Sequence, residues 1–200
     1  MKPFLFSLSA ILLSSALAFA DAVPGQPAPD FTGTDASGKV HKLSDSAGKW
    51  TVLEWSNKEC PYVRKHYDSG NMQKLQKNYT QKGVVWYTVL SSAKGKEGYT
   101  EPADALKQVT ADKASPTAVL MDPTGTIGRA YGAKTTPHMF VINPQGKVVY
   151  AGAIDNNDSS DPAVIAKSKN YVSAALDAGL SGKPVEVAVS RAYGCGVKYQ

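Results

Sequence analysis

Cysteine is scarce in this sequence, which has only Cys60 and Cys195 among its 200 residues. Two cysteines cannot build the disulfide framework of a small secreted scaffold, nor can they supply a four-cysteine zinc site. A chain of this length can bury a substantial core without either kind of cross-link. The two cysteines therefore either form one structural bridge or leave at least one thiol for chemistry.

A strong charge of one sign is also lacking. The 22 lysines and arginines against 17 aspartates and glutamates give a net charge of +5, and no run of five or six basic residues occurs. No motif of a nucleic-acid-binding module is present, so we expect no nucleic-acid partner. The sequence has no P-loop, no Gly-x-Ser-x-Gly, no His-Glu-x-x-His and no flavin or nicotinamide site, so we expect no cofactor.

No apolar run reaches the roughly 20 residues that a membrane span needs. Residues 4–17 are apolar apart from serines, with Lys2 before them and the small-x-small sequence Ala18-Phe19-Ala20 after them. A membrane anchor is the alternative, but this layout is typical of a secretory signal peptide. We expect a signal peptide at residues 1–20 and a periplasmic or secreted mature protein with no membrane span. In such an oxidising compartment disulfides can persist.

The mature chain alternates strand and helix patterns, an order that predicts a mixed sheet with helices on both faces. We expect one α/β domain over residues 21–180 and a tail, residues 181–200, that carries Cys195. The acidic segment 155–161 is expected to be a solvated loop. Strands are predicted at 50–56, 84–90 and 118–121, and a hairpin is predicted from strands at 138–143 and 147–151. Helices are predicted from 61 to about 81, at 102–113 and at 163–180.

Cys60 lies between a predicted strand and a predicted helix that begins at Pro61. The free amides and the dipole at the start of a helix favour a nearby negative charge, and a thiolate is such a charge. Arg64, Lys65 and His66 add positive charge within two turns. We therefore expect the pKa of Cys60 to be lowered and its sulfur to be nucleophilic. The alternative is a buried, inert cysteine.

Two stretches resemble the active site of thioredoxin-like proteins. Residues 52–63, V-L-E-W-S-N-K-E-C-P-Y-V, are similar to their active-site strand and helix start, and residues 135–143, T-T-P-H-M-F-V-I-N, to their cis-proline loop. Residues 28–31, A-P-D-F, are similar to the opening of peroxiredoxins. The chain resembles the peroxiredoxin-like exported redoxins of the alkyl hydroperoxide reductase and thiol-specific antioxidant superfamily. This resemblance implies a thioredoxin-like α/β fold, with a central mixed sheet flanked by helices and followed by a C-terminal tail.

Three positions depart from the patterns of these families. Val63 stands where thioredoxins have the second cysteine of Cys-x-x-Cys, so the local resolving thiol is missing. Asn57 stands where peroxiredoxins have a threonine that holds the peroxide, and Pro137 stands where they have an arginine. Cys60 with Pro61 thus resembles a peroxiredoxin site, whereas the loop at Pro137 resembles that of a thioredoxin.

The resemblance implies a cis peptide bond between Thr136 and Pro137, in a loop opposite Cys60. Such a loop would present the backbone of Thr136 to an extended peptide, which suits a disulfide-bearing protein better than a small peroxide. We therefore expect Thr136, Pro137 and Pro61 to contact the substrate. The alternative is an ordinary trans proline in a turn.

Cys195 is flanked by Gly194 and Gly196, which give it a mobile backbone. A distant tail cysteine can resolve a sulfenic acid or a mixed disulfide formed at Cys60. Two alternatives remain open: a permanent bridge, worth roughly 4–5 kcal/mol in the entropy model, or two thiols that never meet. We expect Cys195 to rest on the same face of the molecule as Cys60.

The sequence predicts an exported thiol-dependent oxidoreductase that reduces disulfides or, more slowly, peroxides. Cys60 would attack and Cys195 would resolve, with electrons from an external thiol donor. One alternative is a redox-inactive module of the same fold that binds a partner through the Pro137 loop. A less favoured alternative is copper handling, for which thiol, imidazole and thioether ligands are suitable; we expect no metal site, although the candidate ligands would be Cys60, His66, His138, Met139 and Cys195.

Overall fold

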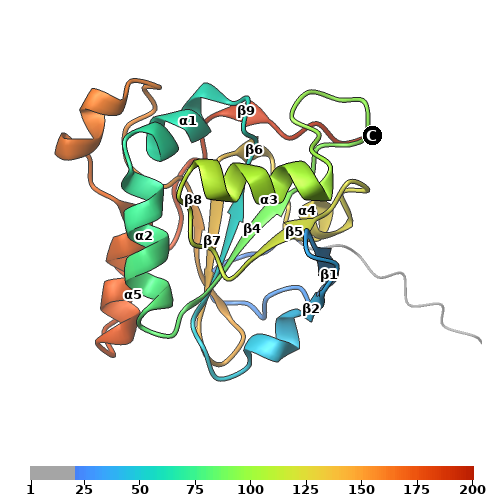
Figure 1. Cartoon of the computed structure of the whole chain (residues 1–200). Coiled ribbons are helices and arrows are strands. Elements are labelled where there is room, and N and C mark those ends of the chain that lie inside the picture. The colour runs from blue at the N-terminus through green and yellow to red at the C-terminus, as the bar shows by residue number, and fades with distance from the viewer. Residues whose placement is uncertain (1–20) are drawn as a thin grey trace, which may run out of the picture.

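Seven strands form one mixed sheet in the order β2-β1-β5-β4-β3-β7-β8 (Figure 1). The computed structural model describes residues 21–200, so the predicted signal peptide lies outside the described residues. Within that described part no helix is both long and apolar enough to cross a bilayer. The strands are β1 (Thr32–Asp35), β2 (Val40–Lys42), β3 (Thr51–Trp55), β4 (Val85–Leu90), β5 (Ala118–Met121), β7 (His138–Ile142) and β8 (Val148–Gly152).

β3 lies at the centre of the functional half of the sheet. It runs parallel to β4 and antiparallel to β7, while β5 extends the parallel part and β8 the antiparallel part. The helices are α1 (Pro61–Asp68), α2 (Asn71–Thr80), α3 (Pro102–Ala111), α4 (Thr126–Ala130) and α5 (Tyr171–Leu180), with 3-10 turns η1 (Leu43–Ser46) and η2 (Pro162–Lys167). The expected α/β architecture, with a mixed sheet and flanking helices, is confirmed.

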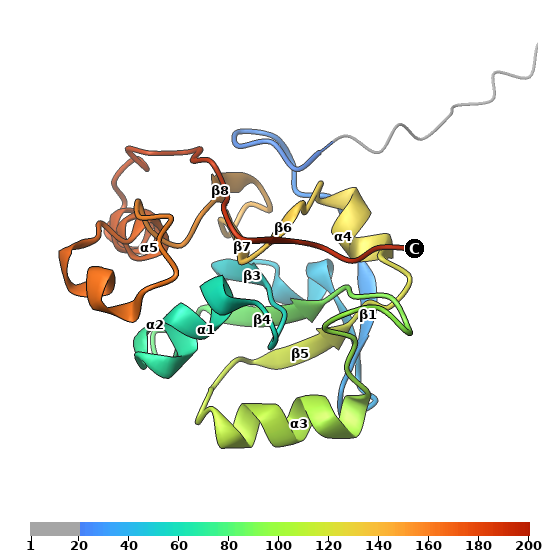
Figure 2. The ribbon, with the colours of Figure 1, turned by 90° about the horizontal axis from the view of Figure 1, so that it is seen from above.

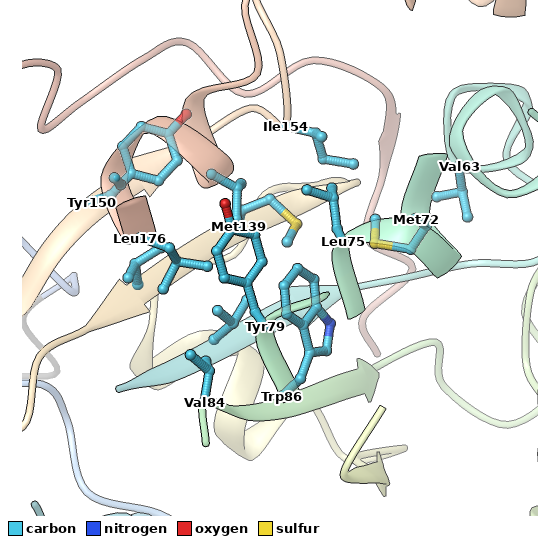
Figure 3. Packing of buried hydrophobic residues seen from close by; sticks show 14 of the residues in the cluster. Val63, Met72, Leu75, Tyr79, Val84, Trp86, Met139, Tyr150, Ile154 and Leu176 are labelled. Carbon is cyan, nitrogen blue, oxygen red and sulfur yellow. The ribbon is translucent and has the colours of Figure 1, made fainter. Parts of the chain in front are cut away.

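Side chains of β3 alternate between two cores, one on each face of the sheet, because successive residues of a strand point in opposite directions. Val52 packs with α1, α2 and α5, in the cluster drawn in Figure 3. Leu53 and Trp55 pack on the other face, against the N-terminal segment and α4. All five residues of β3 are buried, as is usual for a strand covered on both faces.

The helix predicted from 61 to about 81 is in fact two helices. α1 ends at Asp68 and α2 begins at Asn71, because Gly70 between them takes the left-handed conformation with φ of 75°. The helix predicted at 163–180 is likewise divided into η2 and α5. Asn170 separates these two, since its side chain accepts a hydrogen bond from the Ser173 amide at 2.9 Å and so caps α5.

Three of the short elements that were not predicted lie near the Pro137 loop or the tail. Two of them, β6 (Thr135–Thr136) and β9 (Cys195–Gly196), pair as a second, two-stranded sheet, and the third is α4. The tail forms no other named strand, and its one isolated bridge joins Val189 to Ala151. The tail therefore meets the seven-stranded sheet at Ala151 of β8 and pairs with β6 through β9.

A buried carboxyl group ties α1 and α2 to the sheet. Glu54 on β3 is 1% exposed. Its oxygens accept hydrogen bonds from Tyr67 of α1 at 2.7 Å and Gln76 of α2 at 3.0 Å, and from Trp86 and Thr88 of β4 at 2.8 and 3.2 Å. Burial raises the pKa of Glu54, and the four donors oppose that rise. This group sets where α1 lies on the sheet.

Replacing Glu54 tests this arrangement. Glu54→Leu should lower the free energy of unfolding by about 3 kcal/mol or more, because buried donors of Trp86 and Gln76 lose their acceptor. Glu54→Gln should cost about 1 kcal/mol, since its amide oxygen still accepts from both and its NH₂ can donate to the Tyr67 hydroxyl. Urea unfolding of the two variants measures the difference. Equal losses would show that the hydrogen bonds contribute little.

Candidate active site

Cys60 is the residue immediately before α1, and Pro61 is the first residue of the helix. Its backbone carbonyl accepts from the amides of Val63 and Arg64 at 3.0 and 2.9 Å, so the first turn of α1 closes on Cys60 itself. The side chain is completely buried, whereas Pro61 is exposed. The strand β3 and the turn that follows it thus deliver a thiol to the start of a helix, as the sequence predicted.

The loop at Pro137 lies directly against this thiol. The Thr136–Pro137 peptide bond is cis, which confirms the expectation from the resemblance. Cys60 Sγ donates a hydrogen bond to the carbonyl oxygen of Thr136 at 3.0 Å. Thr136 and Pro137 are both buried. Of the three residues predicted to contact a substrate, these two are brought to the cysteine by the fold, and Pro61 follows it in the chain.

The second cysteine meets the same loop from the tail. In the antiparallel pairing of β6 with β9, Cys195 stands opposite Thr136. It packs against the core cluster that contains Cys60, and both cysteines are free thiols. The predicted placement of Cys195 on the Cys60 face is confirmed. Burial, followed by a hydrogen bond with the Cys60 thiol, raises the pKa of Cys195 to about 12.

The three basic residues of α1 do not act as predicted. Arg64 is held by Asp68 and by both oxygens of Asp112, each at 3.0 Å. Lys65 is fully buried and points into an ion pair, and His66 is also fully buried. Their charges are therefore compensated or absent, and they do not supply free positive charge to the thiol. The feature that can still stabilise a thiolate at Cys60 is its position at the start of α1.

A buried polar cluster joins α1 to the tail. Lys65 Nζ lies 3.1 Å from Asp155 Oδ2, 2.7 Å from the Asn157 carbonyl oxygen and 3.3 Å from the Tyr193 hydroxyl. The Tyr193 hydroxyl in turn donates to Asp155. Asp155 is 2% exposed, so the expectation that segment 155–161 is a solvated loop is wrong at its first residue. The reason is that Lys65 needs a buried counter-charge.

His66 completes this cluster in its neutral form. Asn71 Nδ2 lies 2.8 Å from His66 Nδ1, and His66 Nε2 lies 3.4 Å from the Tyr193 hydroxyl. Because an amide nitrogen can only donate, Nδ1 is the acceptor and Nε2 carries the proton. Burial lowers the pKa of His66 from its ordinary 6.5 to about 4, despite the nearby Asp155. The sequence had no signal for this cluster, because its members come from three distant segments.

Across residues 21–200, no three His, Cys, Asp or Glu side chains come together as a metal site would require. Of the candidate copper ligands, Met139 is fully buried in the core and His66 bonds Asn71 and Tyr193.

Comparison with known proteins adds a family and a fold. A sequence model described as the AhpC/TSA family matches residues 24–151. The thiol-disulfide oxidoreductase ResA of Bacillus thuringiensis subsp. konkukian (strain 97-27) is 30% identical over 125 residues. That match covers 62% of this chain and 66% of ResA, just under two thirds of the relative's length.

Two solved structures share the fold. Hypothetical protein SMc02350 from Sinorhizobium meliloti 1021 superposes with a TM-score of 0.76 at 22% identity, covering 90% of this chain and 97% of that one. The thioredoxin domain of thiol-disulfide oxidoreductase BVU-2223 from Bacteroides vulgatus superposes with a TM-score of 0.51 at 23% identity, covering 64% and 87%. The thioredoxin-like fold predicted from the sequence is therefore shown.

The neutral, buried His66 should make the protein sensitive to acid. Its folded-state pKa lies below its unfolded value, so the stability that it provides is present above pH 6.5 and is lost as the pH falls towards 4. The loss can reach about 3 kcal/mol. His66→Gln should therefore lose less stability than the wild type between pH 7.5 and 4.5, measured by urea unfolding.

The comparison isolates His66 because the other shifted histidine stays in both proteins. Burial lowers the pKa of His138 to about 4 as well, and its contribution cancels in the difference. Parallel pH profiles for the wild type and His66→Gln would mean that folding does not shift the pKa of His66.

Proposed function

Because the chain belongs to the AhpC/TSA family of thioredoxin-fold proteins, we propose that it is a thiol-disulfide oxidoreductase in which Cys60 is the attacking sulfur. One observation carries the proposal: Cys60 immediately precedes α1 and contacts the carbonyl oxygen before a cis proline, with Cys195 on the strand that pairs with β6. The name of the matching relative, thiol-disulfide oxidoreductase ResA, supports the same class of reaction.

The reaction proceeds in two exchanges. Cys60 loses its proton, and its thiolate attacks one sulfur of a substrate disulfide; the substrate S–S bond breaks and the other sulfur leaves as a thiolate. Cys195 then loses its proton and attacks Cys60, which releases the first substrate sulfur and forms a Cys60–Cys195 disulfide. An external thiol donor reduces that disulfide and so supplies the two electrons of each cycle.

The geometry favours this order of attack. Two of the causes that raise the pKa of Cys195 are the hydrogen bond with Cys60 and the charge of Cys60. Both disappear once Cys60 is bonded to a substrate sulfur, so the Cys195 thiol becomes more acidic when it is needed. In the resting state Cys195 stays protonated, which keeps it from competing with Cys60 for substrate.

Peroxide is the poorer substrate in this proposal. Asn57, at the position of the peroxide-holding threonine of peroxiredoxins, is buried, and its Oδ1 accepts from the Glu59 amide at 2.8 Å. Pro137, at the position of their arginine, has no donor. We further propose that the protein is exported, which the signal-peptide pattern of residues 1–20 supports, and that its substrates are disulfide-bearing proteins.

Cys60→Ser should abolish reduction of a model protein disulfide, because a hydroxyl at this position does not attack sulfur. Cys195→Ser is the matched variant. It should complete one exchange and then stop as a mixed disulfide at Cys60, which mass spectrometry of the intact protein detects. In the wild type, peptide mapping after oxidation should show a Cys60–Cys195 link.

Two outcomes contradict the proposal. Unchanged turnover in Cys60→Ser would remove the assigned nucleophile. A wild type that reduces no disulfide with any thiol donor would favour the redox-inactive binding module, for which the complete burial of Cys60 would then be the explanation.

Peroxide reduction should be slow, close to that of an ordinary thiolate. Each missing preorganised donor can cost roughly 10²–10³ in rate, by analogy with oxyanion-hole deletions. Stopped-flow mixing of the reduced protein with hydrogen peroxide measures the rate, and Cys60→Ser provides the blank. A rate near the diffusion limit would show that other groups replace Asn57 and Pro137.

A further inference from the structure

The proposed nucleophile is covered by the chain's own tail. Cys60 is 0% exposed, so no external sulfur can reach it in this conformation. The covering segment includes Cys195, which packs against the Cys60 cluster and stands opposite Thr136, whose carbonyl oxygen accepts from the Cys60 thiol. Figure 2 shows the red C-terminal segment running alongside β6 as it crosses the molecule. An external disulfide must therefore displace this segment before it can react.

The tail binds the loop as an extended peptide would. β9 pairs antiparallel with β6, with Cys195 opposite Thr136 and Gly196 opposite Thr135. The Val197 amide continues the pairing by donating to the Lys134 carbonyl at 3.0 Å. Addition of a strand to an exposed backbone edge is a common mode of peptide recognition. Here the added strand presents a cysteine to the active-site cysteine.

The close approach of this strand demands a glycine before the cysteine. A Cβ on Gly194 would lie 2.1 Å from the Thr136 carbonyl oxygen, and the residue has a φ of 131°, which side chains rarely adopt. Since the oxygen belongs to the backbone, it cannot move aside as a flexible side chain could. Any strand that docks in this register needs glycine at the same place.

Two aromatic anchors hold the tail on either side of Cys195. Tyr193, before it, places its hydroxyl in the buried cluster of Lys65, His66 and Asp155. Tyr199, after it, donates to the Ala133 carbonyl at 2.8 Å, and the Arg129 guanidinium lies 4.5 Å from its ring centre. The ring rests on α4, where a Cβ on Gly128 would lie 2.3 Å from its hydroxyl oxygen.

We propose that residues 194–197 are an internal substrate mimic that closes the active site. The segment occupies the edge of β6 and shields Cys60 until an extended polypeptide with a Gly-Cys sequence displaces it. When it returns, it brings Cys195 back to resolve the mixed disulfide. The interpretation of residues 194–197 as a substrate mimic rests on the proposed function. The shielding of Cys60, in contrast, can be measured without any turnover.

Alkylation of Cys60 tests the shield. In the Cys195→Ser background, Cys60 is the only thiol, and iodoacetamide labelling followed by mass spectrometry gives its rate. Tyr199→Ala should raise that rate by roughly tenfold or more, because a lost half-buried hydrogen bond and a lost cation–π contact shift the opening equilibrium by about that factor. Gln200→Ala is the matched control, because the hydrogen bond assigned to Gln200 uses its backbone oxygen, and it should leave the rate unchanged.

Dependence on urea separates local opening from unfolding. If only the tail opens, the labelling rate is insensitive to low urea, whereas labelling through global unfolding rises steeply with urea. The proposal is overturned if Cys60 of the Cys195→Ser protein reacts as fast as an unfolded cysteine, if Tyr199→Ala and Gln200→Ala react alike, or if labelling follows global unfolding. None of these outcomes affects the turnover assay of Cys60→Ser, so failure of the shield and failure of the proposed function are distinguished.

A peptide pair tests the mimicry. One peptide copies residues 192–198, with its cysteine linked by a disulfide to thionitrobenzoate; the other has leucine in place of the glycine before the cysteine. Cys60 attacks the peptide sulfur and releases coloured thionitrobenzoate. In Tyr199→Ala, the glycine peptide should react several-fold faster than the leucine peptide. Equal rates would show that β6 does not select its strand as the tail contact implies.

Discussion

The hydrogen bond from the Cys60 thiol to the Thr136 carbonyl oxygen joins the three segments on which this site depends. Cys60 immediately precedes α1, whereas Thr136 precedes the cis proline and belongs to β6, the strand that pairs with the tail. The Glu54 network places α1 on the sheet. The Pro137 loop is placed by β7, the strand that follows it and pairs with β3. The contact closes only because both placements agree. If either shifted, the thiol would lose both its partner and its cover.

Helix α1 serves this site at both of its turns. Its first turn holds Cys60, and its second turn places Lys65 and His66 in the cluster that anchors Tyr193. Burying a charged pair in this way costs solvation energy, so the pair fixes the position of its partners more than it stabilises the fold. Here the partner is the tail, two residues before Cys195. The helix that carries the proposed nucleophile therefore also fixes where the second cysteine lies.

The missing Cys-x-x-Cys motif is explained by this arrangement. Val63, in the place of a second cysteine, is buried and packs in the core of α1 and α2. The second thiol instead comes from the C-terminal tail, which Tyr193 and Tyr199 anchor against the domain. A thiol within the same helical turn is always adjacent, whereas a thiol on a tail can leave and return. The difference gives this chain a site that its own C-terminus can close.

The sequence alone determined the fold class, the central strands, the hairpin and the candidate cysteine at a helix start, because strand and helix patterns and the loop around Pro137 are local. It also indicated that Cys195 should reach the Cys60 face. It did not determine the division of α1 from α2 at Gly70, nor the burial of Lys65, His66 and Asp155, nor the pairing of β9 with β6. The division at Gly70 comes from its left-handed backbone conformation, and β9 pairs with β6 through backbone hydrogen bonds between distant segments. The burial of Lys65, His66 and Asp155 arises where side chains distant in the chain compensate one another's charge and hydrogen bonds. Only the tertiary structure decides such contacts, since burial changes what each charged group must find as a partner.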